Sequence, residues 1–312
     1  MSSTAHLPLR ALAPAKINLG LLVGPMRPDS RHELVSVMQS ISLADELTLE
    51  RAPAGTDADE IVCPGVPGSE QDNLAGRALA AFRAATGWNP GPLRLTIVKR
   101  VPVAGGLGGG SGDAAAALRL AALASGMSDG ARLGELAREL GADVPAQVTP
   151  GRWLARGVGE RLTALPAPSE LFGVLVLPVA AGLSTAHVYA EADRLGSPRT
   201  QADLDERARR LSEALGGGEQ LPSEELLVND LQRAAISLCP AIDDALARAR
   251  ACGAHTALVS GSGPTVLGLF AGLDGPAKAR RAAEELAGRD PAPLAAVPVD
   301  AHFARVRNNA SS

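Results

Sequence analysis

The chain has 312 residues, enough for one large or two ordinary domains, and 30 basic residues against 34 acidic ones give a net charge of −4. No basic stripe occurs, which excludes a nucleic-acid surface, and no run approaches the ~20 apolar residues of a membrane span. The three cysteines, Cys63, Cys239 and Cys252, form no CxxC pair, and the N-terminus lacks an apolar signal region. We therefore expect reduced thiols and a cytoplasmic location.

The first half of the chain predicts strands followed by helices. Strands are expected at residues 9–23, 35–42, 45–51 and 93–99, a hairpin at 152–165, and helices at 74–86 and 129–140. Pro14 interrupts the first strand, since proline favours an edge or a strand start. Asp72 is the expected cap of the first helix, and Gly87 closes it. Residues 1–8 have the composition of a loose leader.

The second half alternates between strand and helix patterns after an expected linker at residues 166–168, which divides the chain into domains 1–165 and 166–312. Strands are expected at 172–177, 255–259, 265–270 and 294–305, and helices at 184–195, 200–215, 223–236, 240–252 and 276–287. This β-α-β patterning predicts a ferredoxin-like α+β sandwich. A disordered tail is expected at 308–312.

A glycine-rich turn follows the strand predicted at 93–99. Six of the eight residues at 105–112 are glycine, and an alanine-rich helix that ends near residue 125 begins directly afterwards. Glycines let the backbone approach a phosphate closely, and the free N–H groups of a helix N-terminus attract negative charge. A tight loop beside a core helix is the alternative, but such a loop needs only one or two glycines. We therefore expect a nucleotide phosphate site.

Two better-known phosphate motifs do not fit this turn. A Walker A loop ends in Gly-Lys-Ser/Thr, but Gly110 is followed by Ser-Gly-Asp. A dinucleotide fingerprint needs its third glycine where Ser111 or Asp113 stands.

Lysine is rare in this chain, since only Lys16, Lys99 and Lys278 occur among the 30 basic residues. Where arginine supplies the charge elsewhere, a lysine indicates a place that favours a compact ammonium group.

Three stretches together resemble the GHMP kinase family (galactose, homoserine, mevalonate and phosphomevalonate kinases). They are PAKINL at 14–19, PVAGGLGGGS at 102–111 and VSGSGPT at 259–265, in the family's order and across most of the chain. Further stretches at 27–32, 140–145 and 182–189 resemble a subfamily that phosphorylates a hydroxyl of a cytidine-diphosphate (CDP)-linked methylerythritol in the non-mevalonate isoprenoid route. The resemblance implies a ribosomal S5 domain 2-like N-terminal domain, with a left-handed crossover, and a ferredoxin-like C-terminal domain.

The resemblance also implies the chemistry of the site. Asp143 is expected to be the general base that takes the proton of the acceptor hydroxyl. Lys16 is expected to stabilise the transferred phosphoryl group and to hold Asp143 ionised. Asn18, two residues further along the same strand face, is expected to bind substrate. From the residues alone, Asp143 is alternatively an aspartate that hydrogen-bonds within a turn, and Lys16 a solvated lysine on a strand. Asn18 is alternatively a turn residue at the end of a strand.

The residues that the resemblance assigns to ATP are Asn73, Lys99, Pro102, Gly105, Gly106, Leu107, Gly108, Gly109, Gly110, Ser111, Gly112 and Asp113. Gly106 to Gly112 are expected to wrap the phosphates with backbone N–H groups. Ser111 either binds phosphate, assists Mg²⁺ or caps the helix, so no metal ligand is assigned firmly. Asp113 is expected to face ribose, metal or solvent. Asn73 is alternatively a capping residue, and Lys99 alternatively a surface charge.

The residues that the resemblance assigns to the acceptor substrate are Asn18, Arg31, His32, Thr185, Tyr189, Gly261, Ser262 and Gly263. His32 is expected to read cytosine largely through its backbone, Thr185 to contact the diphosphate, and Tyr189, the single tyrosine, to stack on the base. The subfamily has an aromatic residue where Arg31 stands. Arg31 therefore either stacks on the base, reaches the diphosphate, or marks a change of substrate.

The expected protein is an ATP- and Mg²⁺-dependent small-molecule kinase, monomeric or homodimeric, with no nucleic-acid or membrane partner. A second interpretation is a GHMP kinase for another alcohol, of the homoserine or mevalonate type. A third, from a different class, is a non-catalytic sensor of this fold that binds nucleotide without turnover. Intact Lys16, Asp143 and the glycine turn favour a kinase over the sensor.

Overall fold

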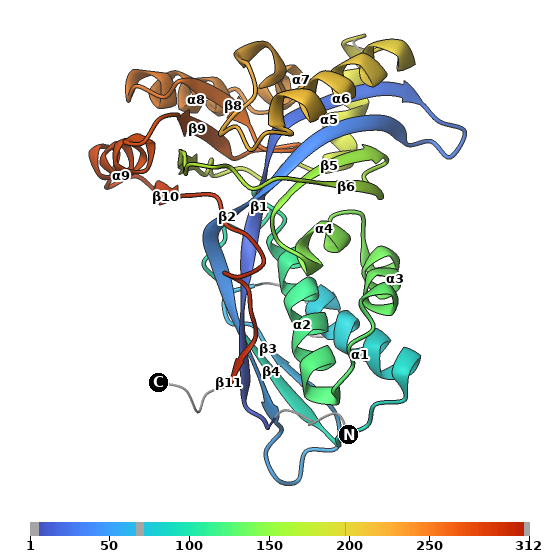
Figure 1. Ribbon diagram of the computed structural model, residues 1–312. Coiled ribbons are helices and arrows are strands. Elements are labelled where there is room, and N and C mark those ends of the chain that lie inside the picture. Colours follow the sequence, from blue (N-terminus) through green and yellow to red (C-terminus); the bar gives the residue numbers. More distant parts are fainter. Residues whose placement is uncertain (1–5, 67–71, 197, 309–312) are drawn as a thin grey trace.

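The computed structural model describes residues 6–66, 72–196 and 198–308, so most of the expected leader and tail lie outside the described residues. The N-terminal half is a sheet in the order β11-β1-β2-β4-β3, with β5 beside β2 and β6 beside β5. Its strands are β1 (Leu9–Met26), β2 (His32–Arg51), β3 (Glu60–Val62), β4 (Leu93–Val98), β5 (Arg152–Gly157), β6 (Arg161–Leu165) and β11 (Arg307–Asn308). The long strands β1 and β2 run through both halves of the molecule (Figure 1).

Four helices lie on one side of this sheet (Figure 1). They are α1 (Leu74–Thr86), α2 (Gly109–Ser125), α3 (Gly130–Leu140) and α4 (Val144–Val148). Helix α2 is buried on almost every side from Gly112 to Ala124 and packs against α1, β1 and α4. Alanine both favours a helix and lets neighbouring elements approach closely, which explains the alanine run. None of the described helices is both long and apolar enough to cross a membrane.

Two predictions for the first strands were wrong. Pro14 does not interrupt β1, which continues to Met26 with shifts of register between Pro14 and Lys16 and at two later points. β2 is one strand rather than two, because its first half pairs with β5 and its second half with β4. Because β2 changes its partner strand along its length, the side chains it buries also change, and the alternation of apolar and polar residues is interrupted although the strand is continuous.

Asn73, rather than Asp72, is the N-cap of α1.

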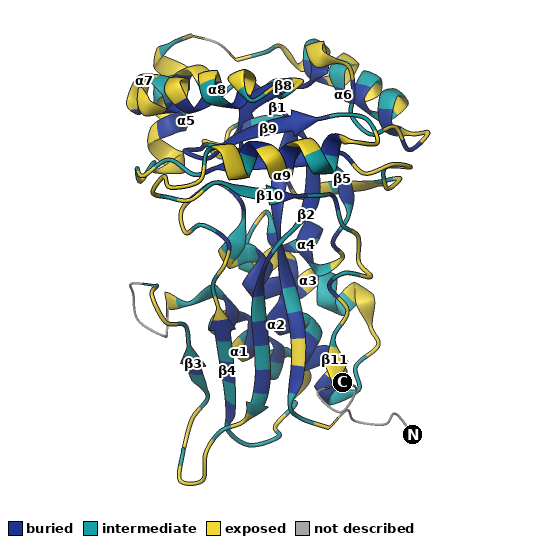
Figure 2. Ribbon diagram, turned by 90° about the vertical axis from the view of Figure 1, so that its left-hand side faces the viewer, coloured by how far each residue is buried: buried dark blue, intermediate teal, exposed yellow. Residues whose placement is uncertain are grey.

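The C-terminal half has a four-stranded antiparallel sheet in the order β10-β7-β9-β8. Its strands are β7 (Gly173–Leu177), β8 (Thr256–Val259), β9 (Val266–Phe270) and β10 (Leu294–Ala296), and its helices are α5 (Thr185–Arg194), α6 (Gln201–Leu215), α7 (Gln232–Leu238), α8 (Ala241–Ala251) and α9 (Gly275–Glu285). The spatial order of fourth, first, third and second strand confirms the ferredoxin-like prediction. Figure 2 shows the outer faces of these helices exposed.

Two predictions for the second half were also wrong. The helix expected at 223–236 is a short 3₁₀ turn, η2 (Glu224–Leu226), followed by an extended segment and then α7. The segment pairs with β1, since Leu21 N–H donates to Val228 O and Asp230 N–H donates to Leu21 O. The strand expected at 294–305 ends at Ala296, after which the chain returns to β2 and finally pairs as β11 with β1.

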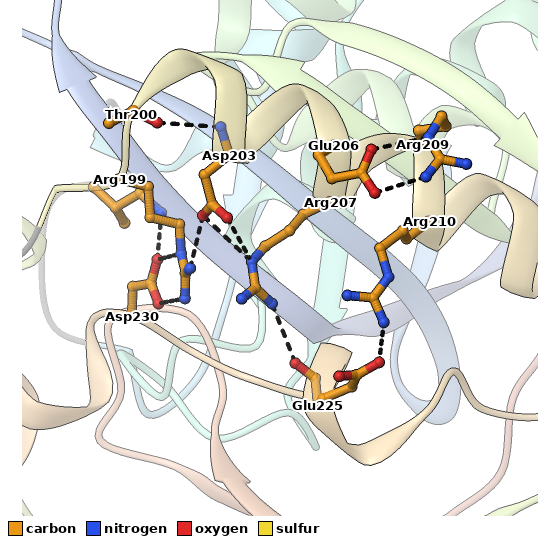
Figure 3. Close-up of polar contacts among 10 residues, drawn as sticks. Arg199, Thr200, Asp203, Glu206, Arg207, Arg209, Arg210, Glu225 and Asp230 are labelled. Carbon is orange, nitrogen blue, oxygen red and sulfur yellow. Dashed lines mark hydrogen bonds and ion pairs between the residues drawn. The ribbon is translucent and has the colours of Figure 1, made fainter.

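An ion-pair network connects α6 and the segment before it to β1 (Figure 3). Asp230 accepts from Arg199 Nε at 2.6 Å and Nη2 at 2.7 Å, and also from the backbone N–H of Val23 at 2.9 Å. The Asp230 side chain is 15% exposed. A half-buried carboxylate with three donors contributes more than an exposed pair, so Asp230 helps to hold the distal part of β1 on the C-terminal half.

We expect Asp230→Asn to lower the free energy of unfolding by about 1–3 kcal/mol, because it removes the charge that three donors share. Urea denaturation monitored by circular dichroism measures this change. Glu213→Gln is the matched control, since Glu213 pairs with Arg209 on the exposed face of α6 and should unfold like the wild type. An unchanged midpoint for Asp230→Asn would contradict the prediction.

Candidate active site

A cavity of about 750 Å³ lies along the β1–β2 hairpin, and we call it the hairpin cavity. Its walls come from β1, β2, α5, the turn between β5 and β6 and the turn after β8. The candidate residues that line it are Lys16, Asn18, Arg31, His32, Asp143, Thr185, Tyr189, Gly261 and Ser262. The structure therefore brings both candidate catalytic residues and all but one of the candidate substrate residues to one space. The exception is Gly263, which packs against Val259 and Leu183.

A second cavity, of about 420 Å³, lies on the other side of the glycine-rich turn, and we call it the glycine-loop cavity. The candidate residues that line it are Asn73, Lys99, Pro102, Gly105, Gly106, Leu107, Gly108, Gly109, Gly110, Ser111 and Asp113. Gly106 and Gly108 line both cavities. These two glycines are therefore a wall that the two cavities share.

The turn leaves a row of backbone donors free at the start of α2. Gly106 and Gly108 have φ values of 73° and 67°, which favour glycine, and Gly108 is the N-cap of α2. The N–H groups of residues 108–111 lack partners within the helix, and such groups are suited to binding an anion. Ser111 lies inside the first turn, so its interpretation as the cap was wrong. Gly112 N–H donates to Gly108 O at 2.8 Å and is not available to a phosphate.

Lys16 and Asp143 form an ion pair in the hairpin cavity, where the Lys16 side chain packs against Gly108. Lys16 Nζ lies 3.5 Å from Asp143 Oδ2 and donates to Asn18 Oδ1 at 2.9 Å. Asn18 in turn donates to Ser36 Oγ at 2.7 Å, so the lysine is held by a chain of polar contacts on one strand face. Asp143 precedes α4, and its side chain makes no capping hydrogen bond there and is 33% exposed. Its carboxylate is thus available to a substrate hydroxyl.

A buried ion cluster forms the floor of the glycine-loop cavity. Lys99 Nζ contacts Asp45 and lies 2.6 Å from Asp113 Oδ2, and Asp45 also accepts from the backbone N–H of Val101. Lys99 is therefore not a surface charge. The prediction that Asp113 faces ribose, metal or solvent was wrong, because its carboxylate faces Lys99. The pKa of Asp113 is raised to about 7, chiefly by burial and also by the nearby Asp45 carboxylate, while Lys99 acts in the opposite direction.

The far end of the hairpin cavity contains two stacked rings. His32 and Tyr189 have ring centroids 5.5 Å apart and an angle of 24° between their planes. His32 Nδ1 lies 2.9 Å from Gly24 O, and Nε2 lies 3.1 Å from Asp193 Oδ1. Both ring nitrogens therefore have protein partners, and neither is free to bind a ligand. Burial and nearby Asp143 raise the pKa of Tyr189 to about 12, which keeps the phenol neutral.

The remaining candidates lie at the edges of the two cavities. Thr185 Oγ1 and Ser262 Oγ lie 3.0 Å apart and join the start of α5 to the turn after β8. Arg31 is 62% exposed and pairs with Asp29 at 2.9 Å. Asn73 Oδ1 accepts from Ala75 N–H at 2.9 Å, so the capping interpretation of Asn73 is confirmed.

Four residues that organise the site were not predicted as site residues from the sequence. They are Asp193, Arg119, Gln147 and Asn229, which contact His32, α4, Gly108 and the turn after β8 respectively. Asp193 stands four residues after Tyr189, and this spacing on one helix face could have indicated it. Arg119 is the one charged residue in the alanine-rich run 114–124 and could have been noticed for that reason. Asn229 belongs to a stretch, 229–231, that also resembles the subfamily, although the resemblance gave it no role, and nothing in the sequence pattern marked Gln147.

Comparison with known proteins identifies the family. The GHMP kinases N terminal domain matches residues 73–151, and the GHMP kinases C terminal domain matches residues 205–289. The chain is 41% identical over 261 residues to a 4-diphosphocytidyl-2-C-methyl-D-erythritol kinase of Streptomyces coelicolor, across 81% of this chain and 84% of that protein. The chain belongs to the GHMP kinase family. This confirms the resemblance given by the three sequence stretches.

Solved structures of other GHMP kinases have the same fold as this chain. A crystal structure of 4-(cytidine 5'-diphospho)-2C-methyl-D-erythritol kinase superimposes with a TM-score of 0.72 at 36% identity, covering 93% of this chain and 98% of that chain. Homoserine kinase from Cytophaga hutchinsonii superimposes with a TM-score of 0.68 at 16% identity, covering 98% of this chain and 99% of that one. The second similarity concerns the fold alone.

The space around Gly108 leaves no room for a side chain. A Cβ atom there would lie 2.9 Å from both Lys16 Cγ and Gln147 Nε2, and the positive φ adds strain. We expect Gly108→Ala to lower the free energy of unfolding by about 1–3 kcal/mol in urea denaturation. Gly110→Ala, in the same turn but with open space around its Cβ position, should be as stable as the wild type. Equal stability of the two variants would exclude this packing argument.

The raised pKa of Asp113 has a consequence for stability. The folded protein keeps a proton that the unfolded chain, in which the aspartate has its ordinary pKa of 3.8, has released, so this group contributes stability that is lost as pH rises from about 4 to about 7. Over this range, we expect the wild type to lose on the order of 1–4 kcal/mol relative to Asp113→Asn. Urea denaturation across pH measures the difference, and parallel pH profiles would show that the pKa of Asp113 is not raised.

Proposed function

We propose that this GHMP kinase transfers the γ-phosphoryl group of ATP to a hydroxyl of 4-diphosphocytidyl-2-C-methyl-D-erythritol in the non-mevalonate isoprenoid route. The observation that carries the proposal is the Lys16–Asp143 pair, which lines the hairpin cavity beside Gly108, a residue that lines both cavities. The subfamily is supported by relatives of about 40% identity over most of the chain that carry this name. A shared wall at Gly106 and Gly108 suits direct transfer between two bound substrates.

The transfer step follows from these positions. ATP occupies the glycine-loop cavity, where the free N–H groups of residues 108–111 bind its phosphates. Asp143 accepts the proton of the acceptor hydroxyl as that oxygen bonds to the γ-phosphorus, and the bond from phosphorus to the bridging oxygen of ADP breaks. Lys16, which is buried and 3.5 Å from Asp143, stabilises the charge on the transferred group.

Mg²⁺ bound to ATP supplies charge neutralisation for this transfer. Ser111 offers a hydroxyl in the glycine-loop cavity and is the residue that would hold the ion, since the Asp113 carboxylate is occupied by Lys99. Within the described part of the chain, no three His, Cys, Asp or Glu residues form a metal-binding group. Phosphate oxygens and water would complete the coordination, as is common for Mg²⁺.

The nucleotide end of the acceptor lies toward His32 and Tyr189 in this proposal. Tyr189 stacks on cytosine with the ring face that His32 leaves open, and the backbone of His32 reads the base edge. Thr185 is near the diphosphate, and Arg31, at the same end of the hairpin cavity, faces the nucleotide. Residues 1–165 form the ATP-binding unit and 166–312 the substrate-binding unit of a cytoplasmic enzyme, which is a monomer or a homodimer.

A panel of acceptors tests the function. We expect ATP consumption with 4-diphosphocytidyl-2-C-methyl-D-erythritol and none above background with mevalonate, homoserine or galactose, since only the first carries a nucleotide that can occupy the part of the hairpin cavity lined by His32 and Tyr189. Product formation is followed by coupled ADP release and mass spectrometry. If only an alcohol without a nucleotide is phosphorylated, that alcohol is the substrate and the proposed one is wrong. If no alcohol is phosphorylated, the result favours the nucleotide sensor.

The general base is tested by Asp143→Asn, which keeps the shape of the side chain. We expect kcat to fall at least about 100-fold, because the substituted amide cannot accept the proton, while ATP affinity measured by calorimetry stays near the wild-type value. Asp244→Asn, on the exposed face of α8, is the control and should leave both quantities unchanged. Wild-type kcat in Asp143→Asn would remove Asp143 from this role.

A further inference from the structure

Gln147 is a buried residue that the proposed transfer does not use. It lies in α4, four residues after Asp143, and is 1% exposed. Its Nε2 donates to Gly108 O at 3.1 Å, while its Oε1 has no hydrogen-bond partner among the described residues. An unpartnered buried amide oxygen costs stability. A contribution to the stability of the fold therefore does not explain why a glutamine occupies position 147.

The neighbours of Gln147 connect the two sides of the candidate active site. A Cβ atom on Gly108 would lie 2.9 Å from both Gln147 Nε2 and Lys16 Cγ, so Gln147 and the Lys16 stem pack against the same residue. Gly108 is the N-cap of α2 and lines both cavities. The helix that begins after Asp143 is thus joined, through the Gln147 side chain, to the residue that begins the phosphate site.

Arg119 holds the other end of the same short helix. Its guanidinium donates to Gln147 O at 2.6 Å and to Leu12 O of β1 at 2.8 Å. Burial lowers the pKa of Arg119 to about 10, which still leaves it charged at neutral pH. With five residues, α4 cannot satisfy its last carbonyl groups internally, and Arg119 supplies donors for them. Arg119 therefore anchors the backbone of Gln147 while the side-chain amide reaches Gly108.

We propose that Gln147 is a positioning residue that aligns the glycine loop with Asp143, so that the phosphoryl group bound at the N-terminus of α2 lies in line with the acceptor oxygen. The inference rests on the proposed roles of Asp143 and the glycine loop, but not on the identity of the acceptor alcohol. Small displacements of reacting groups lower reaction rates strongly. The hydrogen bond from Gln147 to Gly108 joins α4, which follows Asp143, to the glycine loop, and so limits such a displacement. Gln147 acts through Gly108 and touches neither substrate.

Gln147→Met tests the proposal, because methionine keeps the length of the side chain and removes both polar atoms. Gly108 O keeps its bond from Gly112 N–H, so no new unpartnered carbonyl arises. We expect kcat to fall about 10- to 100-fold, the KM values for ATP and acceptor to change less than about threefold, and the free energy of unfolding to equal or exceed that of the wild type. Gln147→Leu should behave in the same way.

Gln39→Met is the matched control. Gln39 is also a buried glutamine, but both ends of its amide are used, since Nε2 donates to Ser40 O at 2.9 Å and Oε1 accepts from Arg152 Nε at 2.8 Å. This variant should lose stability and keep kcat, the opposite of Gln147→Met. The pair separates a structural glutamine from a positioning one.

Wild-type kcat in Gln147→Met, or a raised KM for ATP with kcat unchanged, would overturn the positioning role. The outcome is distinguishable from failure of the proposed function. If the wild-type enzyme turns over a different alcohol of the panel, the proposed substrate fails while the same kcat comparison, made with that alcohol, still tests Gln147. If the wild-type enzyme turns over no alcohol, both proposals fail.

Discussion

The close packing of the glycine loop on Lys16 is the constraint on which the candidate active site depends. Lys16 N–H donates to Leu107 O at 2.9 Å, so the loop lies directly on β1. The lysine stem passes beneath Gly108, where a Cβ atom would collide with it. Because the loop begins α2, this one contact brings together a helix N-terminus, a buried ammonium group and the glycines that line both cavities.

The continuous ribbon of β1 and β2 determines which distant segments meet at that point. Its proximal part carries Lys16 against α2, and its distal part carries His32 against α5 of the C-terminal half. Asp193 and Tyr189, one helical turn apart, both contact His32. The hairpin cavity is therefore bounded by both halves of the chain, with Asp143 from the N-terminal half and Tyr189 from the C-terminal half in its walls.

Buried polar groups hold these pieces in register. The Asp45–Lys99–Asp113 cluster connects β2, the end of β4 and the second turn of α2 beside the glycine-loop cavity. Arg119, with carbonyl partners and no carboxylate among the described residues, connects α2 to α4 and β1. Groups of this kind are costly to bury, and truncating one leaves its partners unsatisfied. Their concentration around the loop indicates that geometry near the phosphate site takes precedence over stability there.

The sequence by itself determined the family, the ferredoxin-like half, the helix that follows the glycine turn and most of the candidate residues, because these depend on local patterns: glycine spacing, periodicity and short motifs. It did not determine that β1 and β2 are continuous, that residues 227–230 pair with β1, or that Asp113 faces Lys99. Those outcomes depend on neighbours far along the chain, since pairing partners decide where a strand ends and burial decides which charges meet. The contact between Gln147 and Gly108 likewise joins residues far apart in the sequence, so only the tertiary structure shows it.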